Sequence, residues 1–383
     1  MAEPQESDRE LRPRWRPVGL RGGEAFAAPI FHPTDDEFSN FAAYVTSIAS
    51  QIGPSGIAKI VPPQSWQGPP QVPPPPTYRL AGAIAQHVVP SGNASGLYAL
   101  MHETRPAMSF ERFERESTAY ASREQVRNEH TLDDLEDKFW AELAFARPAL
   151  YGADLDGTRF APDVKPWNLN NLPDLLRRGD GAISKPMNGI NTPMLYFGAY
   201  RALFGLHVED MDLLSINYLH YGAPKQWYGA SSTCATMIEL LAAQLMPDEH
   251  AKCAEFLRHK TTLIAPGVFA QNGVRCSTLR QYAGEFVITL PKAYHFGFNL
   301  GLNCAESTNF ALPLWLPFGH AATRCCCAIG GDDVCVIDMR RFEMGWTPGA
   351  CGEASDDESG EADWRSIGTK GAGRRVGRRM GGS

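Results

Sequence analysis

A histidine and a glutamate two residues apart, His207 and Glu209, are the side chains of this sequence best suited to bind a metal. Alternate residues of an extended strand point to the same face, so this imidazole and this carboxylate would project together. A third ligand would complete a facial triad, which leaves three coordination positions open for a substrate and dioxygen. His295 is the candidate because it follows a run typical of a strand. The two-residue motif is common by itself, and two surface polar residues are the ordinary alternative.

Polar side chains also recur on one face of a predicted strand at residues 213–220. Alternation places Ser215 and Asn217 on one side of that strand. A polar group buried in a barrel without a partner costs about 1–3 kcal/mol, and a bound dicarboxylate would supply that partner. Lys225 follows on the next predicted strand, and Trp227 shares its face. The alternatives are a surface lysine that snorkels and a core amide that is already hydrogen-bonded.

The elements that must position these residues are mostly short strands. Runs typical of strands occupy residues 194–198, 213–220, 225–228 and 286–290, and an amphipathic helix is predicted at 233–245. Many short strands with turn signals between them indicate a closed or double-sheet all-β core with helical decoration.

The N-terminal part carries helical signals of its own. Thr34 and Glu37 form a potential capping box that would open a helix ending at Gly53. Four apolar residues would then share one helical face: Phe38, Phe41, Val45 and Ile48. A short strand at 57–61, a stiff proline-rich connector at 68–76 and two helices, at 110–118 and 132–143, are predicted to follow.

Composition sets the class of protein. The chain has 383 residues, of which 43% are hydrophobic and 10% aromatic, enough for a sizeable core. The first twenty residues hold no apolar stretch and no window suits a membrane span, so we expect a soluble intracellular protein with its nine cysteines reduced. A net charge of −7 fits poorly with wrapping DNA and better with a cationic partner, although many enzymes are as acidic.

Longer motifs make the metal interpretation specific. They are HVEDMDL at 207–213, SINYLH at 215–220, GAPKQWY at 222–228 and GLNCAESTNF at 301–310. Together they resemble the JmjC domain of the Jumonji histone lysine demethylases, nearest to the trimethyl-lysine subfamily. Upstream, residues 29–66 resemble the JmjN segment of that subfamily, so the resemblance covers roughly residues 29–340.

The resemblance implies a mainly β fold with helical decoration, a double-stranded β-helix (jelly roll, cupin-like) JmjC core plus a JmjN segment. We divide the chain into a disordered arm at 1–28, JmjN at 29–71, a mixed helical linker at 72–160, the JmjC catalytic domain at 161–328, a zinc-adjacent C-terminal segment at 329–342 and a disordered tail at 343–383. The tail is acidic and then basic, and its RRVGRR run could also be a nuclear-import or anion-binding patch.

The resemblance also assigns the catalytic centre. His207, Glu209 and His295 would bind Fe(II) inside the mouth of the jelly roll. Lys225 would meet the distal carboxylate of 2-oxoglutarate, and the remaining cosubstrate residues would be Tyr151, Asn217 and Trp227.

A second metal is implied on Cys253, His259, Cys325 and Cys327, where the trimethyl-lysine branch has a structural zinc. Two thiolates two residues apart and a cysteine–histidine pair can close a tetrahedral shell with no open position. The spacing is unusual and does not identify the site alone. Cys326 would point away, and the other cysteines are predicted to be ordinary buried or free thiols.

The substrate pocket is also carried over from the family. The residues that match a polar methylammonium pocket are Gly189 (through its carbonyl), Tyr196, Glu209, Ser307 and Asn309. Oxygen atoms there would stabilise the diffuse positive charge of the N-methyl groups, and the small Ser307 would leave space for a third methyl group. Asp154 matches a residue of the peptide groove.

Two further positions depend on the family comparison. Lys260 matches a lysine beside the iron, although an exposed lysine at a helix end is an equal alternative. Met194 stands where relatives of this type usually carry a tyrosine of the peptide groove, which puts peptide affinity and site preference in doubt more than catalysis.

The implied activity is Fe(II)- and 2-oxoglutarate-dependent demethylation of tri- and dimethyl-lysine in histone H3, at tail position nine or thirty-six or both. Succinate, CO2 and formaldehyde would be released. The alternatives are a JmjC protein hydroxylase and a catalytically silent chromatin scaffold. We expect a nuclear protein, a monomer that binds the H3 tail, with no membrane association and no sequence-specific DNA binding.

Overall fold

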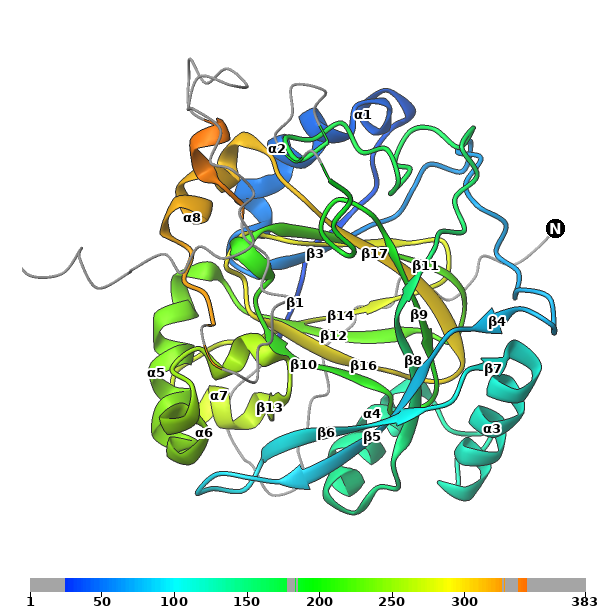
Figure 1. The fold of residues 1–383 in the computed structure, drawn as a ribbon, viewed down its shortest axis with the longest axis vertical. Helices are drawn as coiled ribbons and strands as arrows, with labels where there is room; N and C mark the ends of the chain where they lie inside the picture. The colour runs from blue at the N-terminus through cyan, green and yellow to red at the C-terminus, as the bar shows by residue number, and fades with distance from the viewer. Residues whose placement is uncertain (1–24, 178–182, 184, 326, 328–336, 343–383) are drawn as a thin grey trace, which may run out of the picture. The chain divides into compact units, whose positions relative to one another are not determined.

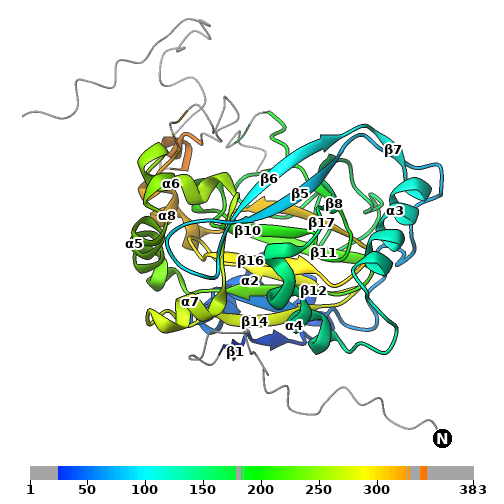
Figure 2. The same ribbon diagram turned by 90° about the horizontal axis from the view of Figure 1, so that it is seen from below.

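Two β-sheets form the framework that positions the pocket (Figures 1 and 2). The structure is a computed structural model that describes residues 25–177, 183, 185–325, 327 and 337–342. The five-stranded sheet has the order β1-β14-β12-β16-β10. Its strands are β1 (Phe26–Ala27), β14 (Ser277–Gln281), β12 (Lys225–Gly229), β16 (His295–Asn299) and β10 (Leu203–His207).

The second sheet has ten strands in the order β13-β6-β5-β8-β9-β17-β11-β15-β3-β2. They are β13 (Thr262–Ile264), β6 (Leu97–Arg105), β5 (Ala83–Pro90), β8 (Ala149–Asp156), β9 (Met194–Gly198), β17 (Asn303–Phe310), β11 (Leu214–Gly222), β15 (Phe286–Thr289), β3 (Ile57–Ile60) and β2 (Ile30–Phe31). A small separate sheet pairs β4 (Arg79–Leu80) with β7 (Met108–Ser109). The predicted mainly β fold is confirmed, with strands of both sheets facing the same pocket.

Helices cover the ends and outer sides of the sheets. The α-helices are α1 (Asp35–Ser39), α2 (Phe41–Ile52), α3 (Phe110–Arg123), α4 (Leu132–Glu142), α5 (Ala235–Leu245), α6 (Pro247–Lys252), α7 (Pro266–Gln271) and α8 (Leu316–Ala321). Short 3-10 turns occur at η1 (Leu143–Phe145), η2 (Asp210–Asp212), η3 (Ser232–Cys234), η4 (Phe256–His259), η5 (Pro313–Trp315) and η6 (Met339–Phe342). Both views place α5, α6 and α7 at one end of the sheets and α3 at the opposite end (Figures 1 and 2). In the part of the chain that the structure describes, no helix is long and apolar enough to cross a bilayer.

The N-terminal helix predicted from Thr34 to Gly53 is two helices. The predicted capping box is present, because Thr34 and Glu37 exchange hydrogen bonds at the start of α1. The chain then leaves the helical conformation at Asn40 (φ −121°, ψ 91°), whose side chain accepts a bond from the N–H of Ala43 and starts α2. Asparagine favours such a cap over a helix interior. The prediction of one continuous helix was therefore wrong at this residue.

The apolar face predicted for this region is buried in the core. Phe38, Phe41, Val45 and Ile48 are each at most 5% exposed. The ring of Phe38 stacks on Trp167 with centroids 4.6 Å apart, and Phe41 meets the same indole edge-on at 4.8 Å. Because each buried aromatic side chain contributes about 1.5–3 kcal/mol, this cluster fixes the N-terminal helices on the ten-stranded sheet.

The segment at 72–160 contributes more strands than predicted. The helices α3 and α4 are present where helices were expected, but β5, β6 and β8 lie between and beside them in the ten-stranded sheet. Register pairs join β5 to β6 and β5 to β8, and β8 continues the sheet to β9. This segment is therefore part of the sheet that lines the pocket.

The predicted arm at 1–28 also ends in a strand. β1 pairs in parallel with β14, and the N–H of Ala28 donates to the carbonyl of Thr278 at 2.9 Å. The rest of the predicted arm, most of the segment at 329–342 and the tail at 343–383 lie outside the described residues, as does Cys326.

Candidate active site

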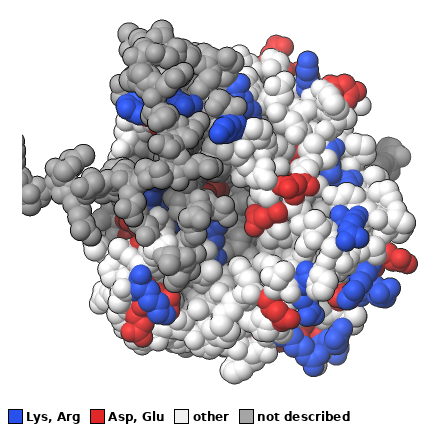
Figure 3. All heavy atoms as spheres, in the orientation of Figure 1, with Lys and Arg blue, Asp and Glu red and all other residues white. Residues whose placement is uncertain are grey.

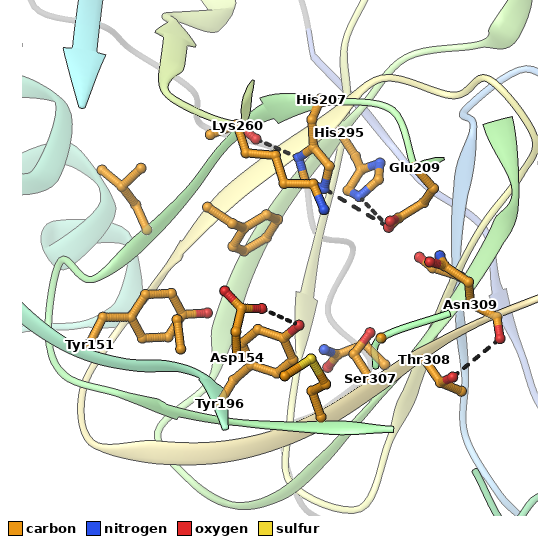
Figure 4. Close-up of a pocket in the computed structure, with 18 of the residues that line it drawn as sticks. Tyr151, Asp154, Tyr196, His207, Glu209, Lys260, His295, Ser307, Thr308 and Asn309 are labelled. Carbon is orange, nitrogen blue, oxygen red and sulfur yellow. Dashed lines mark hydrogen bonds and ion pairs between the residues drawn. The ribbon is translucent and has the colours of Figure 1, made fainter. Parts of the chain in front are cut away.

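A cavity of about 340 Å³ lies between the two sheets, and all the predicted site residues except the four zinc candidates line it. The five-stranded sheet lines it through β10, β12 and β16, and the ten-stranded sheet through β5, β6, β8, β9, β11 and β17. Figure 4 shows His207, Glu209 and His295 pointing toward one another on one side of this cavity, with Tyr196, Asp154 and Tyr151 on the other.

Sheet register brings the two histidines together. His207 ends β10 and pairs directly with His295 at the start of β16, and their ring centroids are 4.3 Å apart. Glu209 follows in extended backbone (φ −69°, ψ 157°), so its carboxylate projects to the same side as His207. Its Oε1 atom lies 3.3 Å from Nε2 of His295 and 3.9 Å from Nε2 of His207. The three predicted ligands converge.

This geometry fits a metal ion with octahedral preferences. Adjacent ligands about 2.1 Å from such an ion lie about 3 Å apart, close to the distances between these donor atoms. Each histidine has its other ring nitrogen at a backbone carbonyl, 2.7 Å at Gly205 and 3.0 Å at Ala293. Those contacts fix both rings with their Nε2 atoms turned toward Glu209, where all three side chains could coordinate one cation.

The protonation states also suit metal binding. Burial, with the nearby His295 and Lys260, lowers the pKa of His207 well below its ordinary value. Burial alone would raise the pKa of Glu209, but its hydrogen bond with His295 and the charge of Lys260 hold that pKa well below the usual range. A neutral imidazole and an ionised carboxylate are the forms that bind a divalent cation.

Lys225 supplies an isolated charge deeper in the cavity. It is 2% exposed, and its ammonium group donates to Oδ1 of Asn299 at 2.7 Å. Burial lowers the pKa of Lys225 to about 7 because no carboxylate among the described residues neutralises it. Oδ1 of Asn217, on the same cavity, is buried without a hydrogen-bond partner. The uncompensated ammonium fits an anionic ligand that enters the cavity, and the Asn217 side chain can add N–H donors from its amide NH2 group.

Trp227 and Tyr151 complete the wall around that lysine. The Trp227 ring lies nearly parallel to His295 with centroids 6.1 Å apart, and its Nε1–H donates to Gln281 at 3.0 Å. The Lys225 ammonium lies 5.9 Å from the centroid of the Tyr151 ring. All four predicted cosubstrate residues therefore line one cavity.

The residues predicted for the substrate line the same cavity. They are Asp154, Gly189, Tyr196, Glu209, Ser307 and Asn309. The Tyr196 hydroxyl donates to Oδ1 of Asp154 at 2.9 Å, which Figure 4 shows as a dashed line. The carbonyl of Gly189 already accepts the N–H of Asn309 at 2.8 Å. One lone pair of that oxygen remains for another donor or cation.

Cys253, His259, Cys325 and Cys327 form a separate cluster. Nε2 of His259 lies 3.1 Å from the sulfur of Cys325 and 3.3 Å from that of Cys327, and the Cys253 and Cys325 sulfurs are 3.6 Å apart. Tetrahedral zinc separates its sulfur ligands by about 3.8 Å, so the cluster has the size of a zinc site. Burial raises the pKa of Cys253 to about 12, and a divalent cation would keep this sulfur deprotonated.

Comparisons with known proteins identify two domains in the chain. Residues 194–310 match the family described as "JmjC domain, hydroxylase", and residues 29–62 match the "jmjN domain" family. The chain belongs to the JmjN/JmjC Jumonji family. Both matches fall inside the ranges predicted for these domains.

Three curated relatives carry demethylase names. Lysine-specific demethylase 4B of Mus musculus is 42% identical over 303 residues, 78% of this chain and 27% of the relative. Lysine-specific demethylase 4D of Rattus norvegicus is 39% identical over 330 residues, 84% and 63% of the two chains. Probable lysine-specific demethylase 4F of Homo sapiens is 38% identical over 301 residues, which are 78% of this chain and 46% of the relative. This Jumonji chain thus spans between about a quarter and two-thirds of the length of these relatives.

Met194 and Lys260 lie where the family resemblance predicted. Met194 starts β9, pairs with Ser307 and lines the cavity. Lys260 lines the cavity beside His207 and adopts a left-handed backbone (φ 59°) directly after η4. Its carbonyl packs close to Gly205, where an added Cβ would lie 2.4 Å from that oxygen. Strand β10, which ends at His207, therefore packs against the segment that carries His259.

Sequence reasoning missed several lining residues because it missed their strands. Gln86 on β5 exchanges two hydrogen bonds with the backbone of Leu203, at 2.9 and 2.8 Å, and so connects the ten-stranded sheet to β10, the strand that ends at His207. His102 on β6 lines the cavity too. The run AIAQHVVP at 83–90 contains β-branched residues that could have indicated a strand. Asn299 was also missed, although it follows His295 on the same strand.

Proposed function

We propose that this protein is an Fe(II)- and 2-oxoglutarate-dependent oxygenase that demethylates tri- and dimethyl-lysine of histone H3, at tail position nine, thirty-six or both. The products would be succinate, CO2 and formaldehyde. The observation that carries the proposal is the convergence of His207, Glu209 and His295 beside Lys225, a buried cation without a carboxylate partner among the described residues. The demethylase names of the relatives support the substrate class.

The chain's own residues would bind and orient the reactants. His207, Glu209 and His295 would hold Fe(II), which together with 2-oxoglutarate and dioxygen supplies the oxidation of an N-methyl group. Lys225 would bind the distal carboxylate of the cosubstrate, and this would restore the charge balance of the buried ammonium. Tyr151 and Asn217 would be further hydrogen-bonding partners of the cosubstrate. Position and electrostatics are the protein's contribution to such chemistry.

On the substrate side the pocket offers oxygen atoms to a cation. Tyr196, Ser307 and Asn309 line it, and the Ser307 hydroxyl donates to the Ile216 carbonyl at 3.0 Å, which turns its lone pairs toward the cavity. A trimethylammonium group has no N–H to donate and a dimethylammonium group has one, so acceptor oxygens are what stabilise either cation. The net charge of −7 and the acidic atoms beside the hollow of the face in Figure 3 suit a basic histone tail.

The test is to incubate the protein with methylated H3 peptides, Fe(II), 2-oxoglutarate and ascorbate. We expect the mass of one CH2 to be lost per methyl group removed, with formaldehyde and succinate formed. His295→Ala should lower the rate more than about 100-fold, because the triad loses a ligand. Asp248→Asn, at an exposed residue of α6 outside the cavity, is the matched control.

The other outcomes identify the alternatives. Gain of one oxygen atom without loss of methyl groups would indicate a protein hydroxylase. Peptide binding with no consumption of 2-oxoglutarate would indicate a scaffold. Unchanged peptides across all methylated positions, with 2-oxoglutarate still decarboxylated, would refute the histone substrate but leave the oxygenase class.

We also propose that the Cys253, His259, Cys325 and Cys327 cluster binds a structural Zn(II), and that the protein acts in the nucleus as a monomer. The four donor atoms lie within 4.8 Å of one another, which supports a closed tetrahedral site. Metal analysis, light scattering and imaging of the tagged chain would test these three points separately.

A further inference from the structure

A β-bulge turns one extra side chain of β8 into the pocket. Tyr151 and Gly152 pair with Gly198 and Phe197 of β9, and Leu155 and Asp156 pair with Leu195 and Met194. Between these pairs, two residues of β8, Ala153 and Asp154, oppose the single residue Tyr196. Bulges of this kind re-aim side chains near functional sites.

Strand parity shows what the bulge changes. Tyr151 and Ala153 line the cavity, as alternate residues should, and in a regular strand Asp154 would face away. Instead Asp154 also lines the cavity, and Leu155 packs on the far side of the sheet with Phe197. Asp154 has a left-handed backbone (φ 53°), which most residues avoid and which aspartate tolerates better than most. The fold thus uses an irregular conformation to direct this carboxylate inward.

The redirected carboxylate fixes the hydrogen of the Tyr196 hydroxyl. An ionised carboxylate is only an acceptor, so Tyr196 must be the donor in its 2.9 Å bond with Asp154. The phenol oxygen then presents its lone pairs, and not its proton, to the rest of the cavity. Met194, next along the same face of β9, has a thioether and therefore offers no second hydroxyl to compete for this carboxylate.

We propose that Asp154 is a positioning residue that holds the Tyr196 proton so that the phenol oxygen can accept the positive charge of a methylated lysine. This rests on the proposed function and assigns Asp154 a role other than direct contact with the peptide backbone. A hydroxyl proton pointing into the cavity would repel a cation, whereas an oxygen backed by a carboxylate attracts it.

The test is a double-mutant cycle with Asp154→Gly and Tyr196→Phe. Glycine suits the left-handed backbone, so it removes the carboxylate without forcing the bulge to change. The protein is loaded with Ni(II) and N-oxalylglycine, an unreactive analogue of 2-oxoglutarate. Binding of an H3 peptide with trimethyl-lysine is compared with binding of the unmodified peptide, so the readout does not depend on turnover.

Each single substitution should reduce the preference for the trimethylated peptide about tenfold, the effect of losing one charge-assisted hydrogen bond. The double substitution should reduce this preference by at most about twofold more than either single substitution, because each one already disrupts the same hydrogen-bonded pair of Asp154 and Tyr196. Asp154→Asn keeps an acceptor oxygen and should restore part of the preference. Asp156→Asn, two residues on and bonded to Asn188 at 2.7 Å, is the matched control and should change nothing.

Two results would overturn this inference and leave the proposed function standing. One is that the fold-changes of the two single substitutions multiply in the double variant. The other is that Asp154→Gly weakens binding of both peptides equally. Either result would mean that Asp154 contacts the peptide directly and does not act through Tyr196. If the wild-type protein binds the trimethylated peptide no more tightly than the unmodified one, the proposed substrate class fails first, and the inference fails with it.

Discussion

The ammonium group of Lys225 is held by the side-chain amide of Asn299, at 2.7 Å, and not by a carboxylate of the described chain. Asn299 is fixed in turn, since its Nδ2 donates to the carbonyl of Ala202 at 2.7 Å and its Oδ1 also accepts from Asn303 at 3.0 Å. This network orients the lysine but leaves its charge without compensation in a buried position. The fold therefore carries an electrostatic cost that a bound dicarboxylate would offset.

Replacement of Lys225 should weaken cosubstrate binding and at the same time stabilise the cosubstrate-free protein. Lys225→Met keeps much of the volume and removes the charge, so affinity for 2-oxoglutarate should fall at least about 30-fold, as expected when one partner of a buried charge pair is lost. The cosubstrate-free protein should become more stable, by about 1 kcal/mol or more, because an unpaired buried ammonium is gone. Calorimetric titration and chemical unfolding would measure the two effects.

Lys59 provides the contrast. It is also buried, but it forms an ion pair of 3.1 Å with Glu285. Lys59→Met should destabilise the protein, because it leaves that carboxylate partly buried without its partner, and should leave 2-oxoglutarate binding unchanged. Equal stability losses for both lysine variants would contradict the assignment of Lys225 as an uncompensated charge.

The pH dependence of cosubstrate binding follows from the same lysine. Burial lowers the pKa of Lys225 from 10.5 to about 7, so between these values the unfolded chain binds more protons than the folded one. Stability of the cosubstrate-free protein should therefore rise with pH across that window. Binding of the dianion needs the ammonium form, so affinity should fall above pH 7 by up to about tenfold per unit. Proton uptake, measured by calorimetry in two buffers, should disappear in Lys225→Met.

The site was easier to predict from the sequence than the sheet that carries it. His207 and Glu209 are two positions apart in extended backbone, so local geometry alone puts them on one face. The pairing with His295 depends on register between β10 and β16, which spacing cannot supply and which only the family motifs indicated. The apolar helical face around Phe41 could be predicted because its residues recur with a regular period. The break at Asn40 could not, because a single asparagine can either cap a new helix or continue the existing one.

Tertiary pairing explains what the sequence did not indicate. The run LYALMHETR of β6 has no strict alternation, and its extended conformation depends on pairing with β5 along its whole length. The bulge at Asp154 leaves no mark in the sequence either, because any aspartate in a strand would look the same. Both features are set by partners that are distant in the chain.

Removal of the proposed zinc should loosen the site formed by His207, Glu209 and His295. His259 ends η4, and the next residue, Lys260, packs its carbonyl against Gly205 of β10. Cys325→Ser should abolish zinc binding and lower the melting temperature by at least about 5 °C, since a structural metal contributes directly to folding. Metal analysis and calorimetry would check both. Cys234→Ser, at a partly buried thiol outside the cluster, should retain the metal; a variant at Cys325 that keeps stoichiometric zinc would exclude this ligand set.

At the bulge, the usual order of stability of alanine and glycine variants should be reversed. In ordinary backbone, glycine is about 0.5–1 kcal/mol less favourable than alanine because it loses more conformational entropy on folding. At φ 53° alanine keeps the left-handed strain, about 1–2 kcal/mol, and glycine does not. Asp154→Gly should therefore be more stable than Asp154→Ala, by about 0.5–1 kcal/mol, although both lose the bond to Tyr196.

The neighbouring aspartate tests this order within the same strand. Asp156 ends β8, and its φ is not positive. At this position the Asp156→Ala variant should therefore be more stable than the Asp156→Gly variant. Urea unfolding of the four variants would give both differences under one set of conditions. If alanine is the more stable at both positions, the left-handed backbone at Asp154 does not persist in solution. The carboxylate would then not be held toward Tyr196, because the side chain of a regular strand at that position faces away from the cavity.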